Sequence, residues 1–327
     1  MLKSTHFLQI SPHFYASFST QEVPVYDTFL YSHQLALDTH QHQSTKYNLK
    51  RTLKKNMKLF LLSTIIGAAA AFAPAVDRSI LQRSAALSQS NDSETALFAK
   101  YKKVFVAGGS KGVGRSIVEK LIAEGSEVVA LLRSDEAVAE LSAIDGVTAV
   151  QGDAFDYKTV EGAIDGCDAA ITTLGGSVDD KEKRVDYTGN NNVIEAAGIL
   201  GCVRVLLVTS VGCGNSKEAA PPAVFETLKD VLAAKSKAEN VLIKYYTNMN
   251  WTIIRPGGLI SEPMTGKATL TADNMGIGSI HREDVADLAV KALSSDNTIR
   301  KVFTAIDPTL NSAANAEGNS FEAFELA

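Results

Sequence analysis

Short runs of β-branched and aliphatic residues alternate with segments in which apolar side chains recur every three or four positions. The short runs predict strands and the periodic segments predict helices. The predicted strands cover residues 103–107, 127–132, 147–151, 169–173, 203–209, 251–255 and 301–306. The predicted helices cover residues 112–123, 135–142, 157–164, 184–198, 225–248 and 283–293. This alternation is typical of an α/β domain with a doubly wound parallel sheet, which we expect as a single domain over residues 100–307.

The residues before this domain differ from it in composition. Five of the six histidines lie before residue 57, and we interpret residues 1–56 as a disordered leader or an upstream extension of the gene model. An apolar run follows Lys58, so residues 57–71 have the layout of a signal peptide and are too short to cross a bilayer as a helix. The Ser- and Ala-rich residues 72–99 are transit peptide-like.

The junction at Ala71-Phe72 resembles the bipartite plastid presequences of algae with complex plastids. That resemblance implies plastid (chloroplast) localisation, while the signal peptide alone also fits ordinary secretion. At the other end of the chain, residues 308–327 contain no Lys or Arg and predict a flexible acidic tail, in which Phe321 and Phe324 are able to dock. We expect no transmembrane segment in the mature chain.

A glycine-rich loop joins the first predicted strand to the first predicted helix. In such loops the first glycine (Gly108) permits the tight turn, the second (Gly112) lets backbone N–H groups approach a pyrophosphate, and the third (Gly114) lets the helix pack closely on the sheet. The strand–loop–helix context is what a dinucleotide site of the Rossmann fold requires. The loop residues expected to bind the cofactor are Gly108, Gly109, Ser110, Lys111, Gly112, Val113 and Gly114.

Two cations near this loop favour NADP(H) as the cofactor. NAD-binding versions of the fold place an acid about 20 positions after the loop, but here the second strand is followed by Arg133. Its guanidinium can bind a 2′-phosphate, and Lys111 can add a second positive charge. The alternative is that both are solvated loop residues.

Charge and cysteine content exclude other classes of site. Residues 100–327 carry 23 Lys and Arg against 31 Asp and Glu, so we expect no nucleic-acid partner. Cys167, Cys202 and Cys213 are odd in number and lack Cys-x-x-Cys spacing. They indicate neither a zinc site nor a disulfide framework, and no metal is expected.

Several motifs beyond the glycine loop resemble one family. Together they are similar to the atypical, NmrA-like single-domain branch of the short-chain dehydrogenase/reductase superfamily, which includes plastid NADP-binding proteins. The motifs are Val150-Gln-Gly-Asp153, Val185-Asp-Tyr-Thr-Gly-Asn-Asn-Asn-Val-Ile-Glu-Ala-Ala197, Val208-Thr-Ser-Val-Gly212, Lys235-Ser-Lys-Ala-Glu239, Thr252-Ile-Ile-Arg-Pro-Gly-Gly258 and Ile280-His-Arg-Glu-Asp-Val-Ala286.

The resemblance implies further cofactor contacts. It places Asp153 beside the adenine and the turn at Pro256 over the nicotinamide, although Asp153 can equally be a turn or helix-cap residue. Because ligands of such sheets bind beyond the carboxyl ends of the strands, Ala154, Leu174 and Gly175 are also expected at the cofactor.

The chain departs from the family pattern at two places. Lys111 stands where this branch usually has glycine, which makes the loop similar to that of the catalytically active reductases. Those enzymes also need Tyr-x-x-x-Lys on the long helix, but Val231 precedes Lys235 by four residues and Ala233 precedes Lys237 by four. The phenol that would pass a proton to a carbonyl oxygen is therefore missing from its usual place.

Lys235 and Ser210 are the candidate catalytic residues. Lys235 lies on an apolar stripe of its predicted helix, so we expect its ammonium to reach nicotinamide-ribose hydroxyls or a carboxylate, the alternative being extension along the helix to water. Ser210 stands where active relatives keep a carbonyl-orienting serine, or it bonds loop backbone only. Cys213 is either a redox-sensitive thiol or a packing residue. His281 is expected to shape a turn.

The sequence thus predicts an NADP(H)-binding oxidoreductase that transfers a hydride to a small carbonyl, quinone or conjugated alkene without a Tyr-x-x-x-Lys relay. The substrate itself is not readable. The alternative is a non-catalytic NADP(H) sensor or an assembly or scaffold factor with a protein partner in a plastid complex. A third interpretation is a flavin or tetrapyrrole reductase whose protons come from solvent.

Overall fold

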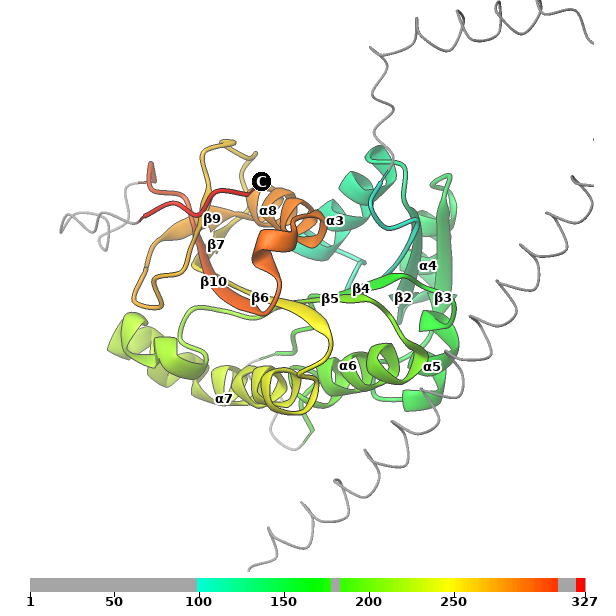
Figure 1. The fold of residues 1–327 in the computed structure, drawn as a ribbon, viewed down its shortest axis with the longest axis horizontal. Coiled ribbons are helices and arrows are strands. Elements are labelled where there is room, and N and C mark those ends of the chain that lie inside the picture. The colour runs from blue at the N-terminus through cyan, green and yellow to red at the C-terminus, as the bar shows by residue number, and fades with distance from the viewer. Residues whose placement is uncertain (1–98, 178–182, 311–321, 327) are drawn as a thin grey trace, which may run out of the picture.

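The computed structural model describes residues 99–177, 183–310 and 322–326, so the leader, signal and transit segments lie outside the described residues. Its centre is an eight-stranded sheet in the order β3-β2-β1-β4-β5-β6-β10-β8 (Figure 1). All neighbours pair in parallel except β8, which is antiparallel to β10. This is the doubly wound Rossmann arrangement that the strand and helix alternation predicts.

The central sheet comprises β1 (Lys103–Ala107), β2 (Glu127–Leu132), β3 (Val147–Gln151), β4 (Ala169–Thr172), β5 (Arg204–Val208), β6 (Asn250–Pro256), β8 (Thr269–Thr271) and β10 (Lys301–Ile306). A two-stranded parallel sheet contains β7 (Gly258–Ile260) and β9 (Ser279–His281). The helices are α3 (Gly112–Ala123), α4 (Asp135–Ser142), α5 (Tyr157–Ile164), α6 (Thr188–Leu200), α7 (Pro222–Tyr245) and α8 (Arg282–Ser294). Two short 3-10 helices, η1 (Gly214–Ala219) and η2 (Asp296–Thr298), complete the elements.

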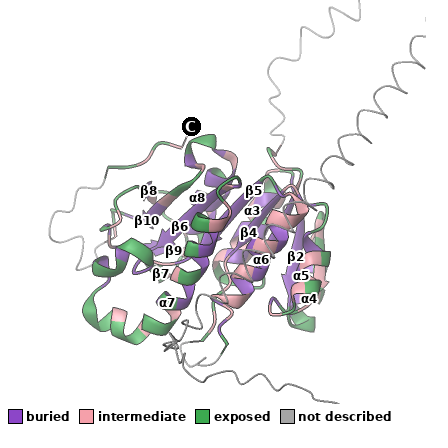
Figure 2. Cartoon of the chain, turned by 60° about the horizontal axis from the view of Figure 1, so that its bottom comes forward, coloured by how far each residue is buried: buried purple, intermediate pink, exposed green. Residues whose placement is uncertain are grey.

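Side chains that alternate along the strands form one apolar layer on each face of the sheet. On β1, Val104 and Val106 pack into the layer under α3, α4 and α8, while Phe105 and Ala107 pack into the layer under α5, α6 and α7. Figure 1 shows these two sets of helices on opposite faces, and Figure 2 shows the buried strands between them. Both faces of a parallel sheet are covered in this way, which explains why its strands are continuous apolar runs.

The elements differ from the sequence prediction mainly at their ends. Strands β7, β8 and β9 were not predicted, because three residues are too few to show a periodicity. The helix expected from residue 184 begins only at Thr188, since Arg184 and Asp186 bond the preceding loop instead. The helix expected over residues 225–248 spans Pro222–Tyr245, and its proline lies in the first turn, where a missing N–H costs little.

Part of the C-terminal tail is docked on the sheet. The backbone N–H of Phe324 donates to the carbonyl of Leu270 on β8, and its ring lies 4.6 Å from that of Phe303 on β10, centroid to centroid. Residues 322–326 therefore cover an edge strand, and the flexible tail expected over residues 308–327 does not include them. Among the described helices, none combines the length and apolarity that a membrane span needs.

A buried arginine ties α8 to the sheet. Arg204, the first residue of β5, is 0% exposed, and its Nη2 donates to the carbonyl of Ala292 (2.8 Å) and to the hydroxyls of Thr252 (2.7 Å) and Thr298 (2.6 Å). Its Nε donates to the carbonyl of Leu293 at 3.2 Å. Burial lowers the pKa of this guanidinium. Two of the four acceptors are carbonyls in the last turn of α8, where a positive charge is favourable.

Candidate dinucleotide site

The loop between β1 and α3 needs glycine at its key positions. Gly108 and Gly112 have φ of 85° and 57°, which disfavours residues that carry a Cβ. A Cβ on Gly108 would also lie 2.6 Å from the Oγ1 of Thr173, and one on Gly114 would collide with the carbonyl of Gly108. The residue before α3, Lys111, makes no side-chain cap. The first N–H groups of α3 are therefore open to an anion.

A cleft of about 1070 Å³ lies above the carboxyl ends of β1 to β4. It brings together most of the cofactor residues expected from the sequence. These are Gly108, Ser110, Lys111, Gly112, Val113, Gly114, Arg133, Asp153, Ala154, Leu174 and Gly175. The glycine cradle and the two cations at its rim fit a dinucleotide, because backbone N–H groups and guanidinium groups both bind phosphate oxygens.

Acidic side chains line the same cleft, which the sequence analysis missed. Glu136 and Glu140 of α4 lie on its wall together with Arg133. The carboxylate of Glu140 accepts a hydrogen bond from Nη1 of Arg115 at 2.7 Å, so part of this negative charge is neutralised. At the next strand end, Asp153 lines the cleft and its Oδ1 also accepts a hydrogen bond from the N–H of Phe155. Asp153 therefore stabilises a turn, which was the alternative role expected for it, and it also lines the cleft.

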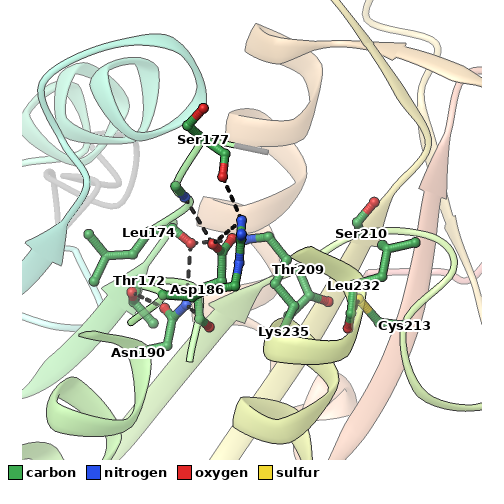
Figure 3. A network of polar contacts seen from close by, with 12 residues as sticks. Thr172, Leu174, Ser177, Asp186, Asn190, Thr209, Ser210, Cys213, Leu232 and Lys235 are labelled. Atoms are coloured by element: carbon green, nitrogen blue, oxygen red, sulfur yellow. Dashed lines mark hydrogen bonds and ion pairs between the residues drawn. The ribbon is translucent and has the colours of Figure 1, made fainter. Parts of the chain in front are cut away.

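Lys235 lies close to a carboxylate (Figure 3), which is one of the two kinds of partner expected from the sequence. It is 8% exposed. Its Nζ donates to the carbonyl of Leu174 at 2.9 Å and lies 3.4 Å from Oδ1 of Asp186. A Cβ on Gly175 would be 3.5 Å from the same Nζ. The ammonium thus supports the segment 174–176, which forms one wall of the cleft.

Asp186 is the acceptor that organises this wall, and sequence reasoning did not select it. Its Oδ2 accepts hydrogen bonds from the N–H of Gly176 (3.1 Å) and from Nη2 of Arg184 (3.3 Å). Nearby, the side-chain amide of Asn190 donates to the carbonyls of Leu174 and Asp186, at 3.2 and 2.8 Å. Both Asp186 and Asn190 lie within the family-like motif of residues 185–197, which was the available signal.

The comparisons with known proteins agree with this site. The model of a family described as NAD(P)H-binding matches residues 108–296, more than half of the chain. The chain belongs to this NAD(P)H-binding family.

Three similar proteins show its range. The chain is 32% identical over 206 residues to the uncharacterized sugar epimerase YhfK of Bacillus subtilis, covering 62% of this chain and 92% of YhfK. It is 33% identical over 214 residues to the uncharacterized chloroplastic protein At2g34460 of Arabidopsis thaliana, covering 62% and 76% of the two chains. Among solved structures, ChuY of Escherichia coli O157:H7, an anaerobillin reductase, superposes with a TM-score of 0.59 at 30% identity, covering 64% of this chain and all of ChuY.

Four residues expected at the site do not line the cleft of this NAD(P)H-binding protein. They are Gly109, Ser210, Lys235 and Pro256. Gly109 faces Val118 of α3. The hydroxyl of Ser210 donates to the carbonyl of Val211 at 3.0 Å, which is its backbone-bonding alternative. Their roles at a bound cofactor stay predictions.

Glu239, four residues after Lys235 on α7, binds side chains at the carboxyl ends of β5 and β6. Its carboxylate accepts two hydrogen bonds from the guanidinium of Arg255, at 3.0 and 2.7 Å, and one from the hydroxyl of Thr209 at 2.7 Å. Cys213 lies in the same region, is 0% exposed and has its pKa raised to about 12 by burial. Its thiol is therefore neutral at physiological pH, which favours packing over redox reactivity.

Arg282 and Ser261 also line the cleft, and neither was expected. They come from the strands and loops around β7 and β9, whose short strands the sequence did not reveal. The residue before Arg282, His281, is buried and lies 3.5 Å from a carboxylate oxygen of Asp284 and 3.6 Å from one of Glu262.

His281, Asp284 and Asp307 together offer donor atoms within 4.8 Å of one another. The two carboxylates already accept hydrogen bonds from Thr265, and Asp307 accepts two more from Thr309. Burial by itself would raise the pKa of Asp307, but the hydrogen bonds from Thr265 and Thr309 together outweigh it, so the pKa is lowered. The carboxylates of Asp284 and Asp307 anchor the segment around Thr265, and the turn-shaping role expected of His281 stays a prediction.

Proposed function

We propose that this protein is an NADP(H)-dependent reductase of a plastid that passes a hydride to a conjugated acceptor, such as a quinone or a conjugated alkene. The observation that carries the proposal is the pairing of a glycine cradle with a buried ammonium, Lys235, which Val231 rather than a tyrosine precedes by four residues. The site is built to bind a dinucleotide but lacks the usual proton donor.

Two cations support NADP(H) rather than NAD(H). Lys111 and Arg133 line the cleft, and Arg133 follows the strand end where an NAD-binding protein has an acid. A guanidinium binds a phosphate with two parallel hydrogen bonds. Glu136 and Glu140 oppose this preference, but Glu140 is already paired with Arg115.

The missing tyrosine restricts the acceptor. NADPH, when bound, supplies a hydride, which leaves negative charge on the reduced acceptor. Lys235 places a positive charge under the wall of the cleft and favours that charge electrostatically. A positioned acid contributes about 10²–10⁴-fold to proton transfer. Without it, simple ketones should react slowly, whereas a conjugated acceptor spreads the charge and takes its proton from water.

The relatives support parts of this proposal. ChuY is a reductase, which supports reduction over the epimerisation named for YhfK. The chloroplastic protein At2g34460 supports a plastid location, as does the presequence expected at residues 57–99. A fluorescent fusion to residues 57–100 that failed to enter a plastid would contradict the location.

The test of the reaction is stopped-flow oxidation of bound NADPH across quinones, enones and simple ketones. We expect acceleration by members of the first two classes and little by ketones, with weaker binding of NADH than of NADPH in parallel titrations. The second candidate function, a non-catalytic NADP(H) sensor or assembly factor, is favoured by the missing tyrosine. Tight NADPH binding without acceleration by any acceptor would establish it instead.

A further inference from the structure

Arg282 approaches the glycine loop from the opposite wall of the cleft. It is the first residue of α8, directly after β9. A Cβ on Gly112 would lie 3.4 Å from Cδ of Arg282 and 3.6 Å from its Nε. The guanidinium therefore lies beside the loop that the proposed function assigns to the cofactor pyrophosphate, and both residues line the same cleft.

The folded chain leaves the charge of Arg282 uncompensated. A cation in the first turn of a helix meets the positive end of the helix dipole, which is unfavourable. The hydrogen bond recorded for its guanidinium goes to a neutral group, the hydroxyl of Ser261, at 2.6 Å. Within the ranges that the structure describes, no carboxylate forms an ion pair with it.

The acidic residues that follow Arg282 are bonded elsewhere. Oε2 of Glu283 accepts from the N–H of Met264, and the carboxylate of Asp284 accepts from the N–H groups of Thr265 and Gly266. Glu283 and Asp284 therefore supply the acidic residues of the first turn of α8, but their carboxylates bond residues 264–266 rather than Arg282. A negatively charged group is the partner that the Arg282 side chain lacks.

We propose that Arg282 binds the pyrophosphate of the dinucleotide, so that the two phosphates lie between this guanidinium and the N–H groups of the glycine loop. The guanidinium fork matches phosphate oxygens, and Ser261 orients it from the side. This inference rests on the proposed dinucleotide function. It assigns to Arg282 a contact that NADPH and NADH share, in contrast to Arg133, which we place at the 2′-phosphate.

Titrations with three ligands separate the two arginines. Arg282→Met should weaken NADPH and NADH by the same factor, about 10- to 100-fold, and leave binding of 2′-AMP unchanged, because 2′-AMP has no pyrophosphate. Arg133→Met should weaken NADPH and 2′-AMP and leave NADH unchanged. Arg282→Lys should recover part of the loss, since it restores the charge but not the fork.

Two control variants guard against an effect of folding. Ser261→Ala removes the recorded hydrogen bond and keeps the guanidinium, and Lys244→Met removes an exposed cation of α7. Lys244→Met should bind NADPH within about threefold of the unmodified protein, and Ser261→Ala should lose less affinity than Arg282→Met because it keeps the guanidinium; both should have an unchanged thermal midpoint. A Ser261→Ala loss equal to that of Arg282→Met would show a structural role and overturn the inference.

The remaining outcomes are also distinct. If the Arg282→Met loss is confined to NADPH and 2′-AMP, the residue binds the 2′-phosphate and the inference is wrong. If affinity does not change, the charge plays no part in binding and the inference is also wrong. An unmodified protein that binds neither NADPH nor NADH would instead refute the proposed function itself.

Discussion

Two buried cations lie at opposite ends of the strands of the sheet and differ in the groups that they bind. Lys235 reaches the carboxyl end of β4, where its ammonium meets the carboxylate of Asp186 and the carbonyl of Leu174. Arg204 lies at the amino end of β5 and bonds the last carbonyls of α8 and two threonine hydroxyls. Burial of a charge is therefore not by itself a sign of a functional site. The location of the partner indicates whether a buried cation belongs to a functional site, because ligands of parallel sheets bind beyond the carboxyl ends of the strands.

The largest expected effect comes from Arg204. Arg204→Met should lower the free energy of unfolding by about 3 kcal/mol, because the carbonyls of Ala292 and Leu293 lose a buried donor. NADPH affinity should stay unchanged, since none of these groups lines the cleft. Urea unfolding with parallel fluorescence titration measures both quantities. An unchanged or increased stability would mean that the cost of burying the guanidinium equals or exceeds its hydrogen bonds.

The contrast between these cations also marks the limit of sequence analysis. The stripe that contains Lys235 was visible because α7 is long and periodic, so a buried ammonium and a carboxylate partner could be expected. Arg204 is the first residue of a five-residue apolar strand, where no pattern distinguishes a buried arginine from an exposed one. Its acceptors come from residues about 50 to 90 positions later in the chain.

The next largest effect concerns Lys235. Lys235→Met leaves Asp186 buried without its ammonium and frees the segment at Leu174, so we expect a loss of about 2 kcal/mol in stability and about tenfold in NADPH affinity. The double variant Lys235→Met, Asp186→Asn also removes the carboxylate that has lost one of its two cationic partners, and it should recover part of the stability but not the affinity. Additive stability losses in this cycle would show that the two side chains are not coupled.

The elements that the sequence predicted well are those marked by a run or a periodic pattern of several neighbouring residues. The glycine loop and all seven longer strands follow from local runs, and residue types at strand ends placed Arg133 and Leu174 at the cleft. Asp186 and Arg282 were missed because their roles depend on contacts between distant segments. Asp186 meets the ammonium of Lys235, which comes much later in the chain on α7. Arg282 reaches the cleft because it follows β9, a strand of only three residues.

The smallest predicted effects concern two buried threonines, Thr252 in the network of Arg204 and Thr172 in the network around Asp186 and Asn190. The hydroxyl of Thr252 donates to the carbonyl of Thr298 and accepts from Arg204, and that of Thr172 donates to Asn190 at 2.6 Å. Thr252→Val and Thr172→Val keep the shape of the side chain and should each cost about 1 kcal/mol of stability.

The two variants should differ in NADPH binding. Only Thr172→Val is expected to raise the Kd, about threefold, because Asn190 also holds the carbonyl of Leu174 at the wall of the cleft. Thr252→Val removes a hydrogen bond near the amino ends of the strands, away from the cleft, and should leave the Kd unchanged. Its loss of stability should nevertheless be the same. Equal weakening by both variants would show that the cleft responds to overall stability rather than to its own polar network. The distinction between the two buried cations would then not hold.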